Sequence, residues 1–384
     1  MSHDPPAVRV PLMVPELPTL AVLTPYLARI DLNRWYSNFG PLVRELEARL
    51  AESFAPAPQP GPHVVTVSNA TAGIELALRA LRLPAGAPVL VPALTFVATA
   101  TAVLSAGLTP IVADVDAESW LLTPDIAKAA LRRERVRAVV PVATFGCPQD
   151  AAAWAALNDR TGIPIVIDAA AAYGNQLDPG PTCAVFSLHA TKPLAAGEGG
   201  FIVSRSERFA EAIRQMTNFG INLTDPKIAP IGTTTMIGTN AKLSEYHAAV
   251  GLASLDQWPD NSARRRALFS DYATELSSVP GIGIIWQRMP DDCVRSVCCF
   301  LVQSEAVRDR AEAALAKAGV ATRRWYLPTI DRHPAFRQIA HLPTPVAYDI
   351  QDRLLGVPFY LGLDVEQRRI VREGLALAAE SGSG

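Results

Sequence analysis

The chain has 384 residues, of which 49% are hydrophobic and 19% charged, so it contains enough apolar material for a large core and a second, smaller one. With a net charge of -2 and a pI near 6.3, the chain lacks the excess of basic residues that is typical of proteins that bind nucleic acid or anionic membranes. No apolar stretch reaches the roughly 20 residues of a membrane span, and MSHDPPAVRV lacks a signal-peptide layout, so we expect a cytoplasmic protein without a membrane partner.

The cysteine pattern predicts neither a disulfide framework nor a metal site. The five cysteines are odd in number and none stands in a CxxC pair. We therefore expect reduced, mostly buried thiols and no bound metal.

From about residue 64, short β-branched runs alternate with longer helical patterns, which predicts an α/β fold with a largely parallel sheet. Several runs are apolar on both faces, as in strands that helices cover on two sides. The seven runs are Val64–Val67, Pro88–Val91, Pro110–Asp114, Ala138–Val142, Ile163–Asp168, Cys183–Ser187 and Gly200–Ser204.

The expected helices begin with residues 71–83, where Ile74, Leu78 and Leu81 form one apolar stripe. Ser68 and Asn69 stand before it as candidate N-caps. A helix is predicted to start near residue 241 and a second one after Pro259. We place a boundary there, with a large domain over residues 1–260 and a small α+β domain over residues 261–384.

Two side chains in this pattern suggest a reactive site. Lys192 follows the strand CAVFS in a glycine-containing loop, where a lysine can meet a carbonyl and lose its proton easily. Asp168 ends the strand IPIVID, at the sheet edge where open α/β sheets bind ligands. A carboxylate there can keep a pyridine nitrogen protonated.

Two further segments fit an aromatic, phosphorylated ligand. The turn SNATAG opens a helix, and a helix N-terminus attracts phosphate through its free N–H groups and dipole. The Thr71 hydroxyl can add a hydrogen bond. Phe96 lies just past the second strand, where its ring can stack on an aromatic ligand, although a core phenylalanine gives the same pattern.

Taken in order, these segments resemble the DegT/DnrJ/StrS family of pyridoxal-5′-phosphate (PLP)-dependent sugar aminotransferases. The similarity runs over nearly the whole chain, through VSNATAGIELAL, VPALTFVATATAV, PIVADVD, PVATFGCP, VIDAAAAYG, FSLHATK with GEGG, and GTNAKLSEYHAAVGL. Agreement of so many ordered blocks is far more specific than one motif. The resemblance implies the aspartate-aminotransferase-like type I fold, with a seven-stranded sheet.

The resemblance also implies a role for each matched residue. Lys192 becomes the Schiff-base lysine and Asp168 the partner of the cofactor's ring nitrogen. Ser187 with Ala70, Thr71 and Ala72 would hold the phosphate, and Phe96 would stack on the ring. Asn240 matches an asparagine that reaches the phosphate of the neighbouring subunit, which implies a homodimer with shared active sites.

The chain departs from the family pattern at two cofactor positions. Ala171 stands where relatives carry Gln or His, which contacts the phenolic oxygen of PLP, and Ala143 stands where a histidine is common. The loss of both polar side chains leaves other reactions of the same cofactor open.

By this resemblance the reaction is a two-step transamination, from an amino donor such as glutamate to a nucleotide-linked keto-sugar. Candidate substrate contacts are Tyr36, His189, Trp325, Tyr326 and His333. Two alternatives stay open: elimination or replacement on an amino acid by the same cofactor, and a non-catalytic regulator that binds PLP or a sugar nucleotide. The sequence does not name the acceptor, the carbon aminated or the stereochemistry.

Overall fold

The computed structural model describes residues 8–54, 61–223 and 225–380, so most of the N-terminal stretch used for the signal-peptide expectation lies outside the described residues. All seven predicted strands are present, which confirms the α/β prediction. They are β1 (His63–Val67), β2 (Pro88–Pro92), β3 (Thr109–Ala113), β4 (Ala138–Val139), β5 (Val166–Asp168), β6 (Cys183–Ser187) and β7 (Gly200–Ser204).

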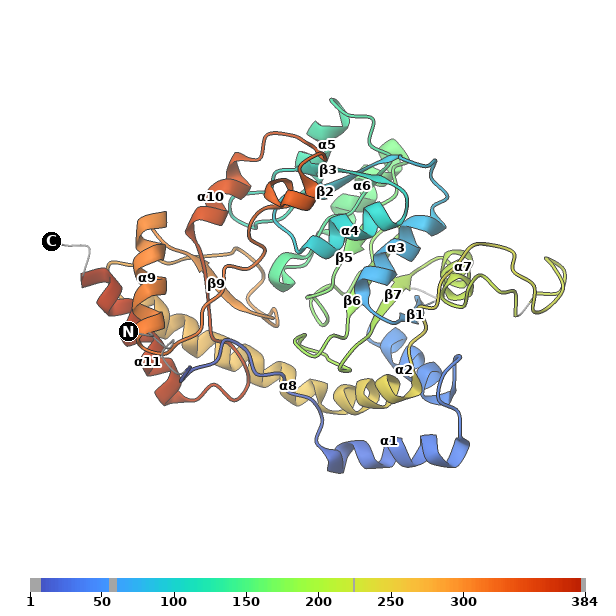
Figure 1. Cartoon of the computed structure of the whole chain (residues 1–384), viewed down its shortest axis with the longest axis horizontal. Helices are drawn as coiled ribbons and strands as arrows, with labels where there is room; N and C mark the ends of the chain where they lie inside the picture. The colour runs from blue at the N-terminus through green and yellow to red at the C-terminus, as the bar shows by residue number, and fades with distance from the viewer. Residues whose placement is uncertain (1–7, 55–60, 224, 381–384) are drawn as a thin grey trace, which may run out of the picture.

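These strands form one layer in the order β1-β7-β6-β5-β4-β2-β3 (Figure 1). Parallel bridges from Val139 to Ile165 and from Val142 to Asp168 join its two halves. Only β7 runs antiparallel to its neighbours among these strands of the described chain. The sheet is therefore mostly parallel, as predicted, and the carboxyl ends of β2, β4, β5 and β6 meet at one edge.

Helices cover both faces of the sheet because its strands alternate side chains between two cores. In β1, Val65 and Val67 enter one core and Val64 enters the other. The first core receives α3 (Ala70–Ala80), α4 (Val97–Ser105) and α7 (Glu207–Thr217). The second receives α1 (Leu20–Asn33), α2 (Pro41–Glu52), α5 (Pro124–Leu131), α6 (Ala151–Thr161) and the start of α8.

The two helices predicted around Pro259 are one continuous helix, α8 (Glu245–Ser277), which corrects that prediction. A proline inside a helix removes one backbone hydrogen bond, here to the carbonyl of Leu255. Packing of α8 against α1 and α2 compensates, and the Trp258 ring lies 4.8 Å from the Tyr173 ring just before the proline. The domain boundary predicted after residue 260 falls inside this helix and stays a prediction.

The C-terminal part has its own core and a three-stranded antiparallel sheet, β11-β9-β8. Its elements are β8 (Ile285–Trp286), β9 (Cys298–Leu301), α9 (Glu305–Lys317), α10 (Pro345–Arg353), β11 (Leu354–Val357) and α11 (Val365–Glu380). Gly319, with φ of 74°, follows the C-terminus of α9 in the left-handed conformation that glycine adopts without strain. The short β10 (Ala340–His341) returns to pair with β3, which brings the segment before it beside the large sheet.

The cysteines of the described residues are reduced, as the sequence predicts. All five cysteines are buried and unpaired. Among the helices of the described residues, none combines the length and the apolar character needed to cross a bilayer.

Candidate active site

Asp168 and Lys192 line one cavity at the carboxyl edge of the sheet. Asp168 is the last residue of β5, and Lys192 lies in the connection from β6 to β7. Because β5 and β6 are parallel neighbours with Asp168 opposite Val185, the loop after β6 leaves the sheet beside the carboxylate. The cavity therefore occupies the edge where parallel sheets bind ligands.

Asp168 is 5% exposed, and its carboxylate has two hydrogen-bond donors. Its Oδ2 accepts the Thr99 hydroxyl at 2.7 Å, and its Oδ1 accepts the backbone N–H of Ala170 at 3.1 Å. Burial raises the pKa of Asp168, while the two donors and the charge of Lys192 act in the opposite direction. The donors hold the carboxylate in one orientation.

The Lys192 amine is set up to act as a nucleophile or base. Burial lowers the pKa of Lys192, and the charge of Asp168 opposes this shift. A lysine that loses its proton more readily attacks carbonyls more readily. The Lys192 backbone N–H donates to the His189 carbonyl at 2.9 Å, which closes the turn that carries the amine.

The N-terminus of α3 forms another wall of the cavity. Asn69 is its N-cap and accepts the N–H of Ala72 at 2.9 Å, while Ala70 and Thr71 line the cavity. The packing depends on Gly200 of β7, because a Cβ there would lie 2.8 Å from the backbone nitrogen of Ala70. Because the N-terminus of this 11-residue helix faces the cavity, its free N–H groups and the positive end of its dipole can bind an anion there.

Aromatic rings flank the cavity. Phe96, the N-cap residue of α4, and Tyr326 both line it, with ring centroids 6.2 Å apart. Phe145 stacks on Tyr326 at 5.0 Å and 12°. Phe145 and Tyr326 have φ of 59° and 64°, a left-handed conformation that is rare for aromatic residues and concentrated at functional sites. Burial raises the pKa of Tyr326, so its phenol is neutral.

The remaining wall is apolar. Ala143 and Ala171, the two departures from the family pattern, both line the cavity, together with Val142 and Ala170. None of these four side chains can donate or accept a hydrogen bond.

Seven of the residues selected from the sequence are not among those that line this cavity: Ala72, Ser187, His189, Asn240, Tyr36, Trp325 and His333. Ser187 ends β6, is buried, and accepts the N–H of His189 at 3.2 Å. His189 is exposed and bonds Thr191 Oγ1 at 2.9 Å, with Glu198 3.7 Å from its Nε2.

Asn240 and Tyr36 lie on the surface. The Asn240 Oδ1 atom accepts the Lys242 ammonium at 2.8 Å. The Tyr36 ring stacks on Tyr246 at 6.2 Å and 17°. Their side chains are therefore available to groups outside this chain.

Trp325 and His333 lie on the C-terminal segment that also carries Tyr326. The Trp325 ring is 6.4 Å from that of Tyr326, and the Arg323 guanidinium lies 4.4 Å from the Trp325 ring. His333 contacts Phe336 edge to face at 6.0 Å.

Sequence reasoning missed Thr95, Thr99 and Phe145. Thr95 and Thr99 form a hydroxyl chain to Asp168, and Phe145 supports Tyr326. The available signal for the two threonines was the four-residue spacing of Thr95 and Thr99 where a helix follows β2, because residues four apart at a helix start lie on the same face.

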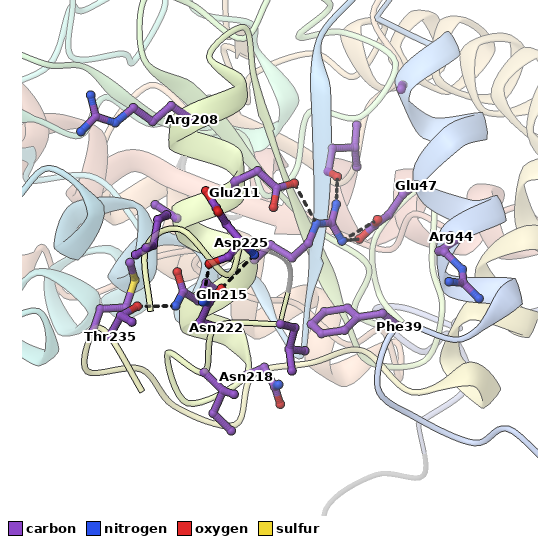
Figure 2. A pocket seen from close by; sticks show the side chains of 18 of the residues that line it. Phe39, Arg44, Glu47, Arg208, Glu211, Gln215, Asn218, Asn222, Asp225 and Thr235 are labelled. Carbon is purple, nitrogen blue, oxygen red and sulfur yellow. Dashed lines mark hydrogen bonds and ion pairs between the residues drawn. The ribbon is translucent and has the colours of Figure 1, made fainter. Parts of the chain in front are cut away.

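A larger cavity, of about 880 Å³, lies between α2, α7 and the segment after α7, and neither Lys192 nor Asp168 lines it (Figure 2). Figure 2 shows Arg44 and Arg208 at opposite ends of it, extending away from each other. Arg214 and Glu47 also line it and are paired with each other at 2.9 Å. Its charged groups do not converge on one point, so we assign the chemistry to the smaller cavity.

Comparison with known proteins identifies the family. The model of the DegT/DnrJ/EryC1/StrS aminotransferase family matches residues 23–375. The chain belongs to this family. The aminotransferase is 29% identical to dTDP-4-amino-4,6-dideoxy-D-glucose transaminase of Escherichia coli over 368 residues, which cover 93% of this chain and 95% of that protein.

Two further relatives extend the comparison. The aminotransferase is 33% identical to the erythromycin biosynthesis sensory transduction protein EryC1 of Saccharopolyspora erythraea over 332 residues, 84% of this chain and 86% of that protein. The crystal structure of DesI, solved in the presence of its TDP-sugar product, matches with a TM-score of 0.85 at 32% identity and covers 98% of this chain and 95% of that one. The predicted family and type I fold are confirmed.

Proposed function

We propose that this aminotransferase uses PLP to move an amino group from a donor such as glutamate to a nucleotide-linked keto-sugar. The observation that carries the proposal is the convergence of Lys192, Asp168 and the N-terminus of α3 on one cavity. The relatives named for a dTDP-amino-sugar and solved with a TDP-sugar product support the acceptor class.

The residues of the cavity fit PLP in their chemistry. The α3 N-terminus suits a phosphate, the Asp168 carboxylate suits a pyridine nitrogen, and the Lys192 amine suits an aldehyde. Phe96 would lie against the ring. When bound, the cofactor supplies an electron sink for breaking a bond at the α-carbon of an amino compound.

The places of Lys192, Asp168, Ala70 and Thr71 in the cavity support their proposed roles, whereas those of Ser187 and Ala72 come from the family resemblance. Lys192 would hold the cofactor and, once the amino donor has replaced it, move a proton between the donor's α-carbon and the cofactor's C4′ atom. The lowered pKa of Lys192 supports the base role. Asp168 would keep the ring nitrogen protonated, and Ser187, Ala70, Thr71 and Ala72 would hold the phosphate.

Substrate would enter over the aromatic side of the cavity. Tyr326 lines it, and Trp325 and His333 lie on the same segment, so these three would contact the acceptor. Tyr36 and His189 remain proposed contacts from the sequence. With alanine at positions 143 and 171, neither position can hydrogen-bond the cofactor's phenolic oxygen.

The proposal includes a homodimer in which Asn240 reaches the partner's phosphate. The segment between α7 and α8 extends away from the body beside α7 (Figure 1) and exposes Phe219, Ile228 and Ile237, which supports a protein partner there. We expect Asn240→Ala to weaken PLP retention in the dimer. Unchanged retention in a dimer of confirmed mass would remove this role.

The test of the cofactor uses the purified wild-type protein. It should bind PLP with visible colour, and borohydride should fix the cofactor to the peptide that contains Lys192, as shown by mass spectrometry. Lys192→Ala should lose both signals, while Lys128→Ala, on the exposed face of α5, should keep them. A colourless protein without an adduct would refute the PLP proposal.

The test of the reaction separates it from its two alternatives. Glutamate should discharge the colour, and keto-sugar nucleotides should restore it. Persistence of colour with every amino donor would contradict transamination and favour a regulator, whereas release of ammonia or a replaced side group from an amino acid would favour elimination or replacement.

A further inference from the structure

Two threonine hydroxyls connect the turn after β2 to Asp168. The Thr95 and Thr99 Oγ1 atoms are 2.9 Å apart, and the Thr99 Oγ1 atom is 2.7 Å from Asp168 Oδ2. Thr95 and Thr99 are 1% and 0% exposed, so water does not compete for these bonds. Buried hydroxyls in a connected chain are fixed in orientation.

The hydrogen bonds that link Thr95, Thr99 and Asp168 can be donated in one direction only. An ionised carboxylate can only accept, so Thr99 must donate its single proton to Asp168. The proton between the two hydroxyls must then come from Thr95. Thr95 therefore fixes the orientation of the Thr99 hydroxyl, and Thr99 fixes the orientation of the Asp168 carboxylate.

This arrangement leaves Asp168 with acceptor capacity for a ligand. The Ala170 N–H occupies one lone pair on Oδ1 and Thr99 one lone pair on Oδ2, while the side chain lines the cavity. A held carboxylate meets a cationic nitrogen without first reorienting.

The donors matter because Asp168 is buried among few compensating charges. Lys192 and Tyr326 are the titratable side chains across the cavity whose charges act on it. Tyr326 is a neutral phenol, and Lys192 is uncharged whenever it acts as a base. In that state, the donors described for Asp168 are Thr99 and the Ala170 N–H.

We propose that Thr99, oriented by Thr95, is a positioning residue that keeps Asp168 an anion and aims it at the ring nitrogen of the cofactor. The inference rests on the proposed function and adds to it a residue that does not itself touch cofactor or substrate.

The experiment compares PLP binding by absorbance titration across pH in the full-length protein. Thr99→Val removes the donor at nearly constant volume, Thr99→Ser keeps it, and Thr101→Val changes an exposed threonine of the same helix. A lost charge-assisted hydrogen bond predicts a roughly 10-fold weaker affinity for Thr99→Val. Without the donor, Asp168 is protonated at higher pH, so the acidic limb of the affinity profile should move up by about one pH unit.

Rescue separates positioning from packing. Thr99→Ser should restore the wild-type affinity and acidic limb, and Thr95→Val should shift both in the direction of Thr99→Val by a smaller amount. If Thr99→Val does not fold, Thr95→Val carries the test with the same limb as readout. An acidic limb unchanged in either valine variant, or no rescue by serine, overturns the inference. A wild-type protein that takes up no PLP refutes the proposed function itself.

Discussion

Glu47→Leu should destabilise the protein because Glu47 covers the open edge of the sheet. Strand β1 pairs only with β7 among the described strands, which leaves its other edge without a ladder. Glu47 Oε1 accepts the N–H and the hydroxyl of Thr66 at 2.8 and 2.9 Å, and Arg214 donates to the Val64 carbonyl at 3.0 Å. The carboxylate of Glu47 and the guanidinium of Arg214 form an ion pair at 2.9 Å.

The loss of stability follows from the groups that lose a partner once leucine replaces Glu47: the Thr66 N–H and hydroxyl and the Arg214 guanidinium. A buried N–H without a partner costs about 1–3 kcal/mol, and removal of one partner from a buried ion pair costs about 3–5 kcal/mol. Arg214 keeps 27% side-chain exposure and a second partner in Glu211, so we expect the low end, about 3 kcal/mol. With an unfolding entropy of about 2.1 cal/mol/K per residue, this lowers the Tm by about 4 °C.

The assay is thermal unfolding of the cofactor-free protein, followed by circular dichroism. Glu211→Gln is the matched control, because the Glu211 side chain is 55% exposed and its carboxylate lies 3.6 Å from the Arg214 guanidinium. Its loss should cost less than about 1 kcal/mol, a shift of about 1 °C at most. If Glu47→Leu lowers the Tm no more than the control does, the pair of Glu47 and Arg214 does not stabilise the free edge of β1.

Asn69→Ala removes the cap of α3 and should cost about 1 kcal/mol in the free energy of unfolding, measured in urea, and weaken PLP binding; a stability equal to wild type would contradict the cap. Gly200→Ala places a Cβ 2.7 Å from the Phe186 carbonyl oxygen, so its soluble yield should fall well below that of Gly61→Ala, where a Cβ meets nothing within 4 Å. Burial raises the pKa of Cys293 to about 11 and of Cys147 to about 12. Because only the thiolate reacts, alkylation of both should be slow at pH 8 and rise with pH; fast labelling of the folded protein at pH 8 would contradict this.

Much of the large sheet could be predicted because its strands are apolar on both faces and bounded by turns. Cys183–Ser187 and Gly200–Ser204 match β6 and β7 residue for residue. The run at 138–142 predicts a longer strand than β4, whose end keeps only an isolated bridge from Val142 to Asp168. Local hydrophobicity predicts a strand, whereas the length of its ladder depends on the neighbouring strand.

The error at Pro259 has a tertiary cause. Proline is a local signal for a helix end, but packing of α8 on α1 and α2 outweighs one lost hydrogen bond. The site shows the same limit. Asp168 and Lys192 were found because strand ends converge in space, while the contact of Phe145 with Tyr326 joins positions 181 apart in the chain, which no local pattern encodes.

The continuous α8 constrains how the two halves of the molecule can move. At 33 residues the helix is about 50 Å long, and it packs against α2 at one end and α11 at the other. Because both parts of the molecule pack on this one helix, a rotation of the C-terminal part relative to the large sheet would have to bend α8 or break its packing at one end. We expect such bending at Pro259, because a proline inside a helix lacks the N–H that would donate to the carbonyl four residues earlier.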